Sequence, residues 1–397
     1  MLSSRRDFLK TSIQGASLIA LAPTVPGFLS STAKETSSQA DARVLVVIQL
    51  DGGNDGINTV VPYRDEGYAK HRNVLRLPAD KLIKIGDGIG LHPSLREAAK
   101  LLETGWLSIV PGVSYPNPSR SHFRSMAVWQ TVRLDPEEHQ GPGWIGRIGD
   151  EVPSAGAIFV GSETPPAALR GRRSIPASVD RLQDFLLPAA IDPKPAAGEV
   201  TSPRNELAAF VQRSLLDAYM TADRIADLGR HGKSEQPEHG LIGHLLTIAR
   251  LIKSGARARI YYTQQGGYDT HAHQLNAHRT LLSNLAYALK SFFDALTEVK
   301  LADRVVVLCF SEFGRRVQEN ASHGTDHGTA GPVFLAGPAV QPGLIGTYPS
   351  LTDLDDGDLK MTVDFRRVYA SVLEKWLGLP SSKPLNGSFE PLPLFRV

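Results

Sequence analysis

Residues 43–50 read RVLVVIQL, an apolar run rich in valine that stops abruptly at DGGNDG, residues 51–56. An unbroken apolar run of this length is typical of a strand that is covered on both faces in a parallel sheet. The acidic, glycine-rich stretch that follows is good turn chemistry by itself. The segment therefore predicts a buried central strand whose carboxyl end carries Asp51.

Similar apolar runs recur along the chain and alternate with segments of helical period. The further runs are residues 106–110, 157–160, 258–263, 304–310 and 332–336, and the helical segments are residues 93–103, 121–131, 205–228, 240–252, 273–299 and 364–377. Strands that alternate with helices predict an α/β fold, a doubly wound and mostly parallel sheet with helices on both faces. Residues 162–203 lack a clear period, so we interpret them as an excursion or cap beside the sheet.

Composition narrows the class of protein. The chain has 397 residues, of which 42% are apolar and 21% charged, as expected for one large globular domain over residues 43–397. Its formal net charge of +2 excludes a general nucleic-acid footprint, so no nucleic-acid partner is expected. An anionic substrate would have to be bound locally.

The first 42 residues read as an export signal and linker. Residues 4–10, SRRDFLK, match the twin-arginine pattern S-R-R-x-F-L-K, and a short apolar stretch interrupted by Pro23 and Pro26 follows. That stretch is too broken to be a permanent membrane span. We therefore expect the twin-arginine translocase to carry the folded protein to the periplasm or beyond.

Acidic and histidine residues follow several predicted strands. Asp51 ends the first strand, Asp269 follows residues 258–263 after a Gly266-Gly267 turn, and Glu312 ends the run at 304–310. Asp326 and His327 lie in the next connection. In doubly wound sheets the functional site lies outside the carboxyl ends of the strands, so we expect these side chains at one edge.

The stretch GGYDTHAHQ, residues 266–274, contains Asp269, His271 and His273. Carboxylates and neutral imidazoles bind zinc, and carboxylates bind calcium and magnesium. Asp269 and His273 are four residues apart at a predicted helix start, so both can face one point, with His271 beside them. The alternative is that Asp269 only caps that helix.

Glu312, directly after a buried strand, would be costly to bury unpaired. Its expected partner is a metal ion, or Arg315 or Arg316 in an ordinary ion pair. His327, beside the apolar strand PVFLAG, is then a candidate third ligand for a metal held by Asp269 and His273.

These segments resemble a known family. LVVIQLDGGNDG, NPSRSHF, GGYDTHAHQ, FSEFGRR, GTDHGTAGPVFLAG and TVDFRRVYASVLEKWLG together resemble the bacterial domain-of-unknown-function 1501 family over residues 43–379. That family is similar to the alkaline phosphatase superfamily, which includes sulfatases. The resemblance implies an alkaline phosphatase/sulfatase-like fold and a divalent metal (zinc, calcium or magnesium).

The superfamily pattern also implies roles for single residues. It places Asp51 in a first-strand metal position, Asp269 and His273 in a D-x-x-x-H position and His327 at the later histidine. Glu312 falls where the superfamily has the aspartate of an Asp-His pair. Phe313 replaces the histidine of that pair, which leaves open whether His271 substitutes for it and whether one or two ions bind.

The nucleophile position departs from the pattern as well. Alignment with the sulfatase signature C-x-P-S-R puts Pro116 where the nucleophile belongs. A shifted alignment offers Ser121 or Ser119, with Arg120 to bind an anion and His122 as a proton carrier. Helix capping is the alternative role for both serines.

Two functions follow. The first is an exported metal-dependent hydrolase of phosphate or sulfate monoesters that acts on a small anionic ester. The second is a catalytically degenerate member that serves binding or assembly in the envelope, as Pro116 and Phe313 suggest.

Overall fold

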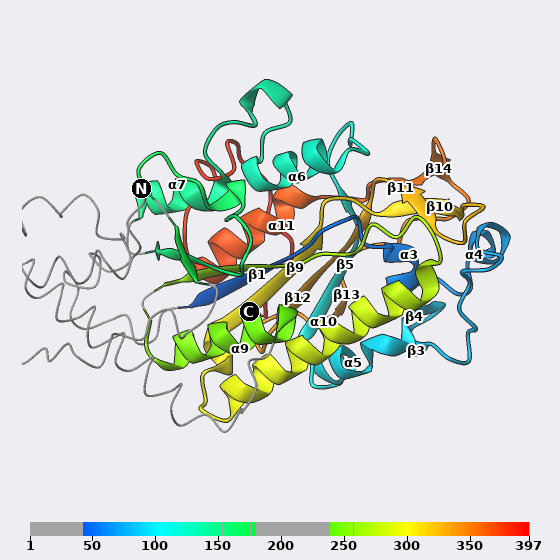
Figure 1. Ribbon diagram of the computed structural model, residues 1–397, viewed down its shortest axis with the longest axis horizontal. Coiled ribbons are helices and arrows are strands. Elements are labelled where there is room, and N and C mark those ends of the chain that lie inside the picture. The colour runs from blue at the N-terminus through cyan, green and yellow to red at the C-terminus, as the bar shows by residue number, and fades with distance from the viewer. Residues whose placement is uncertain (1–42, 153–154, 175, 180–238, 257, 397) are drawn as a thin grey trace, which may run out of the picture.

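The structure is a computed structural model that describes residues 43–152, 155–174, 176–179, 239–256 and 258–396 (Figure 1). The proposed export signal, the predicted helix at 205–228 and residues 180–203 of the predicted excursion lie outside these residues. Among the described residues, no helix combines the length and apolar character needed to cross a membrane.

A nine-stranded sheet forms the centre of the molecule, and all of its strands are parallel except β12. The order across the sheet is β13-β5-β12-β9-β1-β8-β6-β7, and β16 also pairs with β5. This confirms the predicted doubly wound, mostly parallel sheet. The strands are β1 (Val44–Leu50), β5 (Leu107–Ser114), β6 (Ala157–Val160), β7 (Ala177–Val179), β8 (Ile260–Gln265), β9 (Val305–Ser311), β12 (Gly331–Ala336), β13 (Gly343–Leu344) and β16 (Val363–Asp364).

Strand β1 is buried along its whole length because its side chains enter two separate apolar layers. Val46 and Ile48 pack in the layer that contains α5, α9 and α10, whereas Leu45 and Val47 pack in the layer that contains α6, α7 and α11. Figure 1 shows these two helix layers on opposite sides of the sheet. The helices are α5 (Arg96–Glu103), α6 (His122–Thr131), α7 (Trp144–Glu151), α9 (Gly240–Lys253), α10 (Gln274–Thr297) and α11 (Phe365–Ser371).

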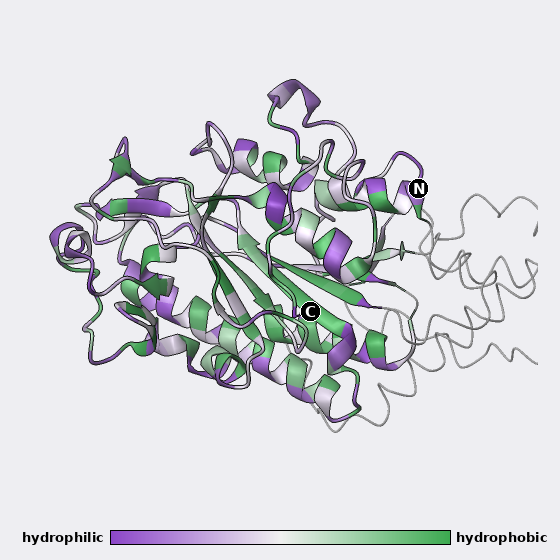
Figure 2. Ribbon diagram, turned by 180° about the vertical axis from the view of Figure 1, so that it is seen from behind, coloured by the Kyte–Doolittle hydropathy of each residue, from purple (hydrophilic) through white to green (hydrophobic). Residues whose placement is uncertain are grey.

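The hydropathy of the strands and helices fits this layering. Figure 2 shows the strands of the central sheet in the hydrophobic colour, while the helices alternate hydrophobic and hydrophilic residues. A sheet covered on both faces needs apolar residues at every strand position, whereas each helix needs them on one side only. This difference in pattern is why the strands could be located from the sequence.

Strand β5 is longer than predicted. The expected strand ended at residue 110, just before Pro111 and Gly112, but β5 continues to Ser114. The pairing with β12 shifts register at this point, between the partners of Val110 and Val113, which accommodates the proline. The carboxyl end of β5 therefore reaches the same edge of the sheet as those of β1, β8 and β9.

Several short elements extend beyond that edge. They are α3 (Gly56–Thr59), α4 (Glu66–His71), the β2-β4-β3 sheet (Val60–Val61, Ile89–Leu91 and Ile83–Gly86), β10 (Arg315–Glu319) with β11 (Thr325–His327), and β14 (Leu354–Asp355) with β15 (Asp358–Leu359). The Asp55 and Arg72 side chains, both fully buried, join α3 to the end of α4, with Arg72 Nη1 2.6 Å from Asp55 Oδ2. These elements form a second, smaller core beside the main sheet.

Candidate metal centre

The carboxyl edge of the sheet collects the predicted acidic residues. Strands β1, β8 and β9 are adjacent and parallel, so Asp51, Asp269 and Glu312 all follow strand ends at this edge. Strand β5 brings the loop before α6 to the same edge, and the β10–β11 hairpin adds His327. Five separate parts of the chain therefore reach this edge.

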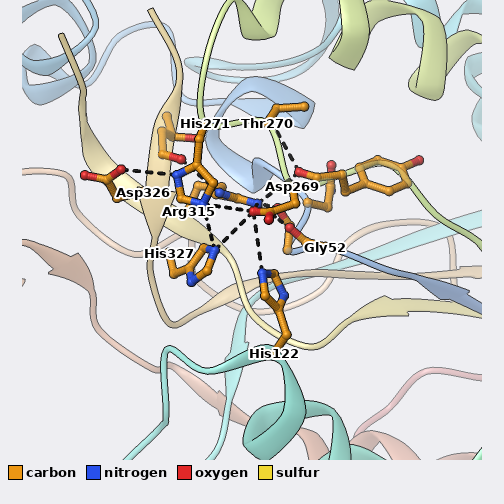
Figure 3. A network of polar contacts seen from close by, with 12 residues as sticks. Gly52, His122, Asp269, Thr270, His271, Arg315, Asp326 and His327 are labelled. Atoms are coloured by element: carbon orange, nitrogen blue, oxygen red, sulfur yellow. Dashed lines mark hydrogen bonds and ion pairs between the residues drawn. The ribbon is translucent and has the colours of Figure 1, made fainter. Parts of the chain in front are cut away.

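Three imidazoles converge on one carboxylate oxygen, as Figure 3 shows. The Nε2 atoms of His271, His327 and His122 lie 3.0, 3.1 and 3.5 Å from Asp269 Oδ1. The Nε2 atoms of His271 and His327 are 2.9 Å apart. The ligand atoms of His122, Asp269 and His327 all lie within 4.8 Å of one another. We call His122, Asp269, His271 and His327 the donor cluster.

The other nitrogen of each ring is held from behind. Nδ1 of His122 lies 2.8 Å from Glu312 Oε1, and Nδ1 of His271 lies 3.3 Å from Asp326 Oδ1. Nδ1 of His327 donates to the backbone carbonyl of Arg120 at 2.8 Å. In a neutral ring that carries its proton on Nδ1, the Nε2 lone pair would point into the cluster. Metal-binding histidines are oriented in this way.

The atoms of His271, His327 and Asp269 are spaced about as closely as the ligands of a zinc site. Ligands at 2.0–2.1 Å in a tetrahedron would be about 3.3 Å apart. The separations among His271, His327 and Asp269 are 2.9–3.1 Å, and the His122 to Asp269 separation is 3.5 Å. Nitrogen and carboxylate donors of this kind suit zinc better than calcium or magnesium.

One atom of the cluster lacks a partner. His122 Nε2 is buried and makes no hydrogen bond within the described part of the chain, although Asp269 Oδ1 lies 3.5 Å away. A buried polar atom that has lost water without gaining a partner is costly, and such atoms mark sites for an ion or a ligand. The rim is open, because the side chains of Asp269 and His271 are 48% and 44% exposed.

Asp269 carries the negative charge of the cluster. Burial alone would raise its pKa, but the hydrogen bond and charge of Arg315, together with the neighbouring His327, lower the pKa to about 2. Arg315 Nη2 donates to Asp269 Oδ1 at 2.7 Å, and its guanidinium also binds the carbonyls of Gly53 and Tyr268. The carboxylate is thus ionised and fixed in direction, as expected for a ligand supported by a second layer of hydrogen bonds.

Glu312 is buried, with 2% of its side chain exposed, and its partner is neither predicted arginine. It accepts hydrogen bonds from the Gly52 backbone N–H at 2.9 Å and from the Ser311 hydroxyl at 2.9 Å. Its hydrogen bond with His122 raises the pKa of that histidine. Arg315 binds Asp269 instead, and Arg316 binds Asp356. Glu312 therefore orients His122 rather than joining the donor cluster.

Asp51 lies at the predicted edge but outside the donor cluster. Its carboxylate accepts hydrogen bonds from Gln49 Nε2 at 2.5 Å and Gln264 Nε2 at 3.2 Å. Burial raises its pKa to about 6, and the charge of Glu312 adds to this rise against the opposing Gln49 hydrogen bond. The structure thus places Asp51 between the side-chain amides of Gln49 and Gln264.

The expected geometry of Asp269 and His273 was wrong. Helix α10 begins at Gln274, so neither residue lies on its first turn, and Asp269 does not cap it. His273 sits just before the helix in a left-handed conformation, and its ring lies 6.3 Å from that of His323. His271, two residues from Asp269 in an extended loop, reaches the cluster where His273 was expected to do so.

The loop before α6 also differs from expectation. The Arg120 guanidinium binds Asp358 and Asp356, at 2.8 Å each, and so is not directed at an anion in the cluster. Ser121 precedes α6 without capping it through its side chain. Ser119 Oγ accepts the Ser121 backbone N–H at 3.2 Å. Capping of α6 therefore explains neither serine hydroxyl.

Two features allow close packing behind the cluster. The Phe313 ring lies 4.9 Å from the His122 ring and 5.0 Å from the His327 ring, and so packs against both imidazoles. Gly52 has φ +114°, and a Cβ there would lie 2.4 Å from the Asp269 backbone nitrogen. Only glycine permits this approach between the β1 and β8 loops.

Comparisons with known proteins bear on the family. The family model described as "Protein of unknown function (DUF1501)" matches residues 42–386. The chain belongs to the DUF1501 family. No curated protein matches it.

Solved structures show distant likenesses to this DUF1501 protein. PsFucS1 sulfatase from Pseudoalteromonas sp. has 10% identity and a TM-score of 0.43 over 92% of this chain and 74% of that chain. The C-terminal periplasmic domain of EcEptC from Escherichia coli, in complex with Zn, has 7% identity and a TM-score of 0.38 over 76% and 75%. The lipoteichoic acid synthase LtaP from Listeria monocytogenes has 12% identity and a TM-score of 0.33 over 84% and 79%.

In this DUF1501 protein, His122 belongs to the donor cluster, whereas the sequence suggested a different role for it. It was expected to carry protons because the shifted alignment of residues 115–123 placed it beside the candidate nucleophiles Ser119 and Ser121. A strand that continues to Ser114 puts the following loop at that edge, where a histidine at a helix start becomes a candidate ligand. The feature of the sequence that could have revealed this position of His122 is the continuation of the β5 strand beyond Pro111.

A change at Glu312 tests the support behind the cluster. Glu312→Gln is expected to weaken metal binding by about 10- to 100-fold, because the ring of His122 loses its charged partner. Competition with a fluorescent zinc chelator would measure this change. Glu298→Gln, an exposed glutamate after α10, is the matched control. An affinity equal to that of the control would show that Glu312 does not orient a ligand.

Proposed function

We propose that this protein is an exported metal-dependent hydrolase of phosphate or sulfate monoesters, with the donor cluster as its catalytic centre. One observation carries the proposal: three imidazole Nε2 atoms converge on Asp269 Oδ1 while each Nδ1 is held by an acceptor. In neutral rings that carry the proton on Nδ1, the Nε2 lone pairs and the carboxylate would face one point, and a bound cation would stabilise that arrangement.

The donor set supports zinc as the ion. Three imidazole nitrogens and one carboxylate oxygen match zinc, whereas calcium and magnesium prefer oxygen ligands. A bound ion would act as a Lewis acid on the ester and would lower the pKa of water. Because amides and His122 engage Asp51 and Glu312, the geometry favours one ion over two.

The chain's own residues would bind and orient the ester. Helix α6 begins at His122, so its first N–H groups lie near the cluster and would suit an anion. Ser121 is the better candidate nucleophile, since its hydroxyl caps nothing and it is adjacent to the ligand His122. Ser119 instead accepts a hydrogen bond within the loop. Its role is therefore to shape the loop that carries Ser121.

Export remains part of the proposal. It rests on residues 4–10, SRRDFLK, which match the twin-arginine pattern and imply the twin-arginine translocase as a partner during transport. Transport in the folded state would allow the metal to be bound before export. The likenesses to sulfatase and periplasmic domains agree with this placement but are too distant to carry it.

A second candidate function is favoured by Arg315. Its guanidinium, fully buried, already supplies a positive charge 2.7 Å from Asp269 Oδ1. If this charge suffices for the cluster, the protein is a catalytically degenerate binding or assembly protein of the envelope. Metal content separates the two functions, because only the first requires a stoichiometric ion.

The test is metal removal and return. The full chain is treated with chelator, and turnover of p-nitrophenyl phosphate and p-nitrophenyl sulfate is followed as zinc is added back. We expect turnover to rise with one equivalent of zinc and to fall by about 100-fold or more in Ser121→Ala, but much less in Ser119→Ala. Protein that binds no metal and hydrolyses neither ester would contradict the proposal and support the envelope-binding alternative.

A further inference from the structure

The two loops that carry three of the four donors meet at one buried amide outside the donor cluster. Asp269 and His271 lie in the loop between β8 and α10, and His327 ends β11. Gln274, the first residue of α10, is fully buried, and its side chain reaches both loops. No step of the proposed chemistry uses this side chain.

A threonine next to the donors of each loop donates a hydrogen bond to Gln274 Oε1. The Thr270 hydroxyl lies 3.1 Å from this oxygen, and the Thr325 hydroxyl lies 2.6 Å from it. Both threonines are buried. Thr270 stands between the two donors of its loop, and Thr325 is two residues from His327, so these two β11 side chains share one face of the strand. One oxygen therefore links the two loops.

The buried ion pair between α3 and α4 fixes which way this amide points. Gln274 Nε2 donates to Asp55 Oδ2, and the same carboxylate oxygen accepts from Arg72 Nη1 at 2.6 Å. An ionised carboxylate can only accept, so the NH2 group of the amide must face Asp55. Exchanging the amide nitrogen and oxygen would place two acceptors face to face. The amide oxygen is thus directed at the two threonines.

The backbone brings the loops together but contains little regular structure there. The Thr325 N–H donates to the Thr270 carbonyl at 3.2 Å, and the Gln274 N–H donates to the His323 carbonyl at 2.9 Å. Strand β11 is three residues long, and α10 begins only after the donors of its loop. Metal ligands must be held within about 0.5 Å of their working positions, which requires side-chain hydrogen bonds behind them. The Gln274 amide supplies such bonds to both loops at once.

We propose that Gln274 is a positioning residue of the metal centre. Through the hydroxyls of Thr270 and Thr325, its amide sets the separation between His327 and the donors of the β8–α10 loop. The inference rests on the proposed function, because it needs an ion at the donor cluster, but it does not depend on which ester is cleaved. Metal affinity then depends on a side chain that acts only through its neighbours.

The first test compares two changes at Thr325. Thr325→Val keeps the shape of the side chain and removes the hydroxyl, whereas Thr325→Ser keeps the hydroxyl. Competition with a fluorescent chelator measures the zinc affinity of the full chain, and the visible absorption of the cobalt-loaded protein reports the arrangement of the ligands. We expect Thr325→Val to weaken zinc binding by about three- to tenfold, less than the loss of a direct partner of a ligand, and to shift the cobalt bands. Thr325→Ser should restore both.

Thr131→Val is the matched control. Thr131 is fully buried and is the last residue of α6. Its hydroxyl donates to the Ala127 carbonyl at 2.6 Å and accepts from the Arg133 N–H at 3.3 Å, so the control also removes a buried hydroxyl with two partners. It should change neither the zinc affinity nor the cobalt spectrum.

The second test asks whether the amide carries the effect. Gln274→Met keeps the length of the side chain but removes the amide. Thr270→Val should weaken zinc binding in the wild-type background and cost nothing further in the Gln274→Met background, because two residues that act through one contact are not additive. Denaturant unfolding identifies the variants that are folded. If Gln274→Met does not fold, the comparison of Thr325→Val with Thr325→Ser decides alone.

Each outcome decides one point. Wild-type zinc affinities and cobalt spectra in Thr325→Val and Thr270→Val would overturn the inference, and so would a Thr325→Ser variant as impaired as Thr325→Val. An undiminished effect of Thr270→Val in the Gln274→Met background would also overturn it. If the variants weaken zinc binding as expected but the wild type hydrolyses no p-nitrophenyl ester, only the hydrolase is contradicted. Wild-type protein that binds neither zinc nor cobalt would overturn both proposals.

Discussion

Asp269→Asn is expected to abolish stoichiometric metal binding and to lower ester turnover by more than about 100-fold. The substitution keeps the shape of the side chain but removes the only negative charge among the four donors. Changes behind a ligand typically cost 10- to 100-fold in metal affinity, so loss of the ligand itself should cost more. Metal content by mass spectrometry and turnover of p-nitrophenyl phosphate would be measured on the same preparation.

The control for Asp269 is an acid in a surface ion pair. Asp87→Asn removes a carboxylate that is 88% exposed and pairs with Arg64, and should change neither metal content nor turnover. His273→Ala adds a second control, because this histidine lies outside the cluster. If Asp269→Asn retained one equivalent of zinc, the carboxylate would not be a ligand. If His273→Ala lost the metal, His273 would be a metal ligand and the donor cluster as defined above would be wrong.

Asp55→Asn is expected to lower the free energy of unfolding by about 3–5 kcal/mol, the usual cost of breaking a buried ion pair. Asp55 and Arg72 are fully buried, and Gln274 also donates to the carboxylate at 2.5 Å. Without the carboxylate, the Arg72 guanidinium stays buried with no opposite charge. Denaturant unfolding would measure the loss. Asp294→Asn, in the exposed Lys290 pair of α10, should cost at most about 0.5 kcal/mol.

The same pair has a defined pH dependence. Burial alone would raise the pKa of Asp55, but the Arg72 guanidinium lowers it from the ordinary 3.8 to about 2. A carboxyl whose pKa is lowered on folding stabilises the protein above its unfolded value and loses that contribution as the pH falls. The wild-type advantage over Asp55→Asn should thus be complete above about pH 4 and shrink toward pH 2. A difference that stays constant over this range would show that Asp55 is not ionised in the folded protein.

Much of the fold was predictable because a strand that is buried on both faces has apolar residues at every position, a pattern that a few consecutive residues reveal. The valine-rich run 43–50 and the similar run before Glu312 became β1 and β9 almost residue for residue. Their ends were predictable too, because a polar residue directly after such a run marks the sheet edge. The predicted strand was shorter than β5. The register shift that accommodates Pro111 within β5 occurs in the pairing with β12, a partner more than 200 residues away, so the local sequence does not reveal it.

The donor cluster was only partly predictable. Asp269, His271 and His327 were named from the sequence, but the preference for His273 depended on a helix that begins later than its period suggested. His122 was assigned another role, since its use depends on the length of β5 and on Glu312, 190 residues away. Arg120 looked like an anion-binding residue until the β14–β15 hairpin was placed against it.

The sequence by itself determined the layered α/β fold and the edge at which polar side chains gather, because hydrophobic patterning and strand direction act over a few residues at a time. Only the tertiary structure decided which rings meet. The direction of an imidazole depends on what accepts its second nitrogen, and here those acceptors are Glu312, Asp326 and the carbonyl of Arg120. For each ring the acceptor lies on a distant part of the chain, so neither spacing nor composition records it.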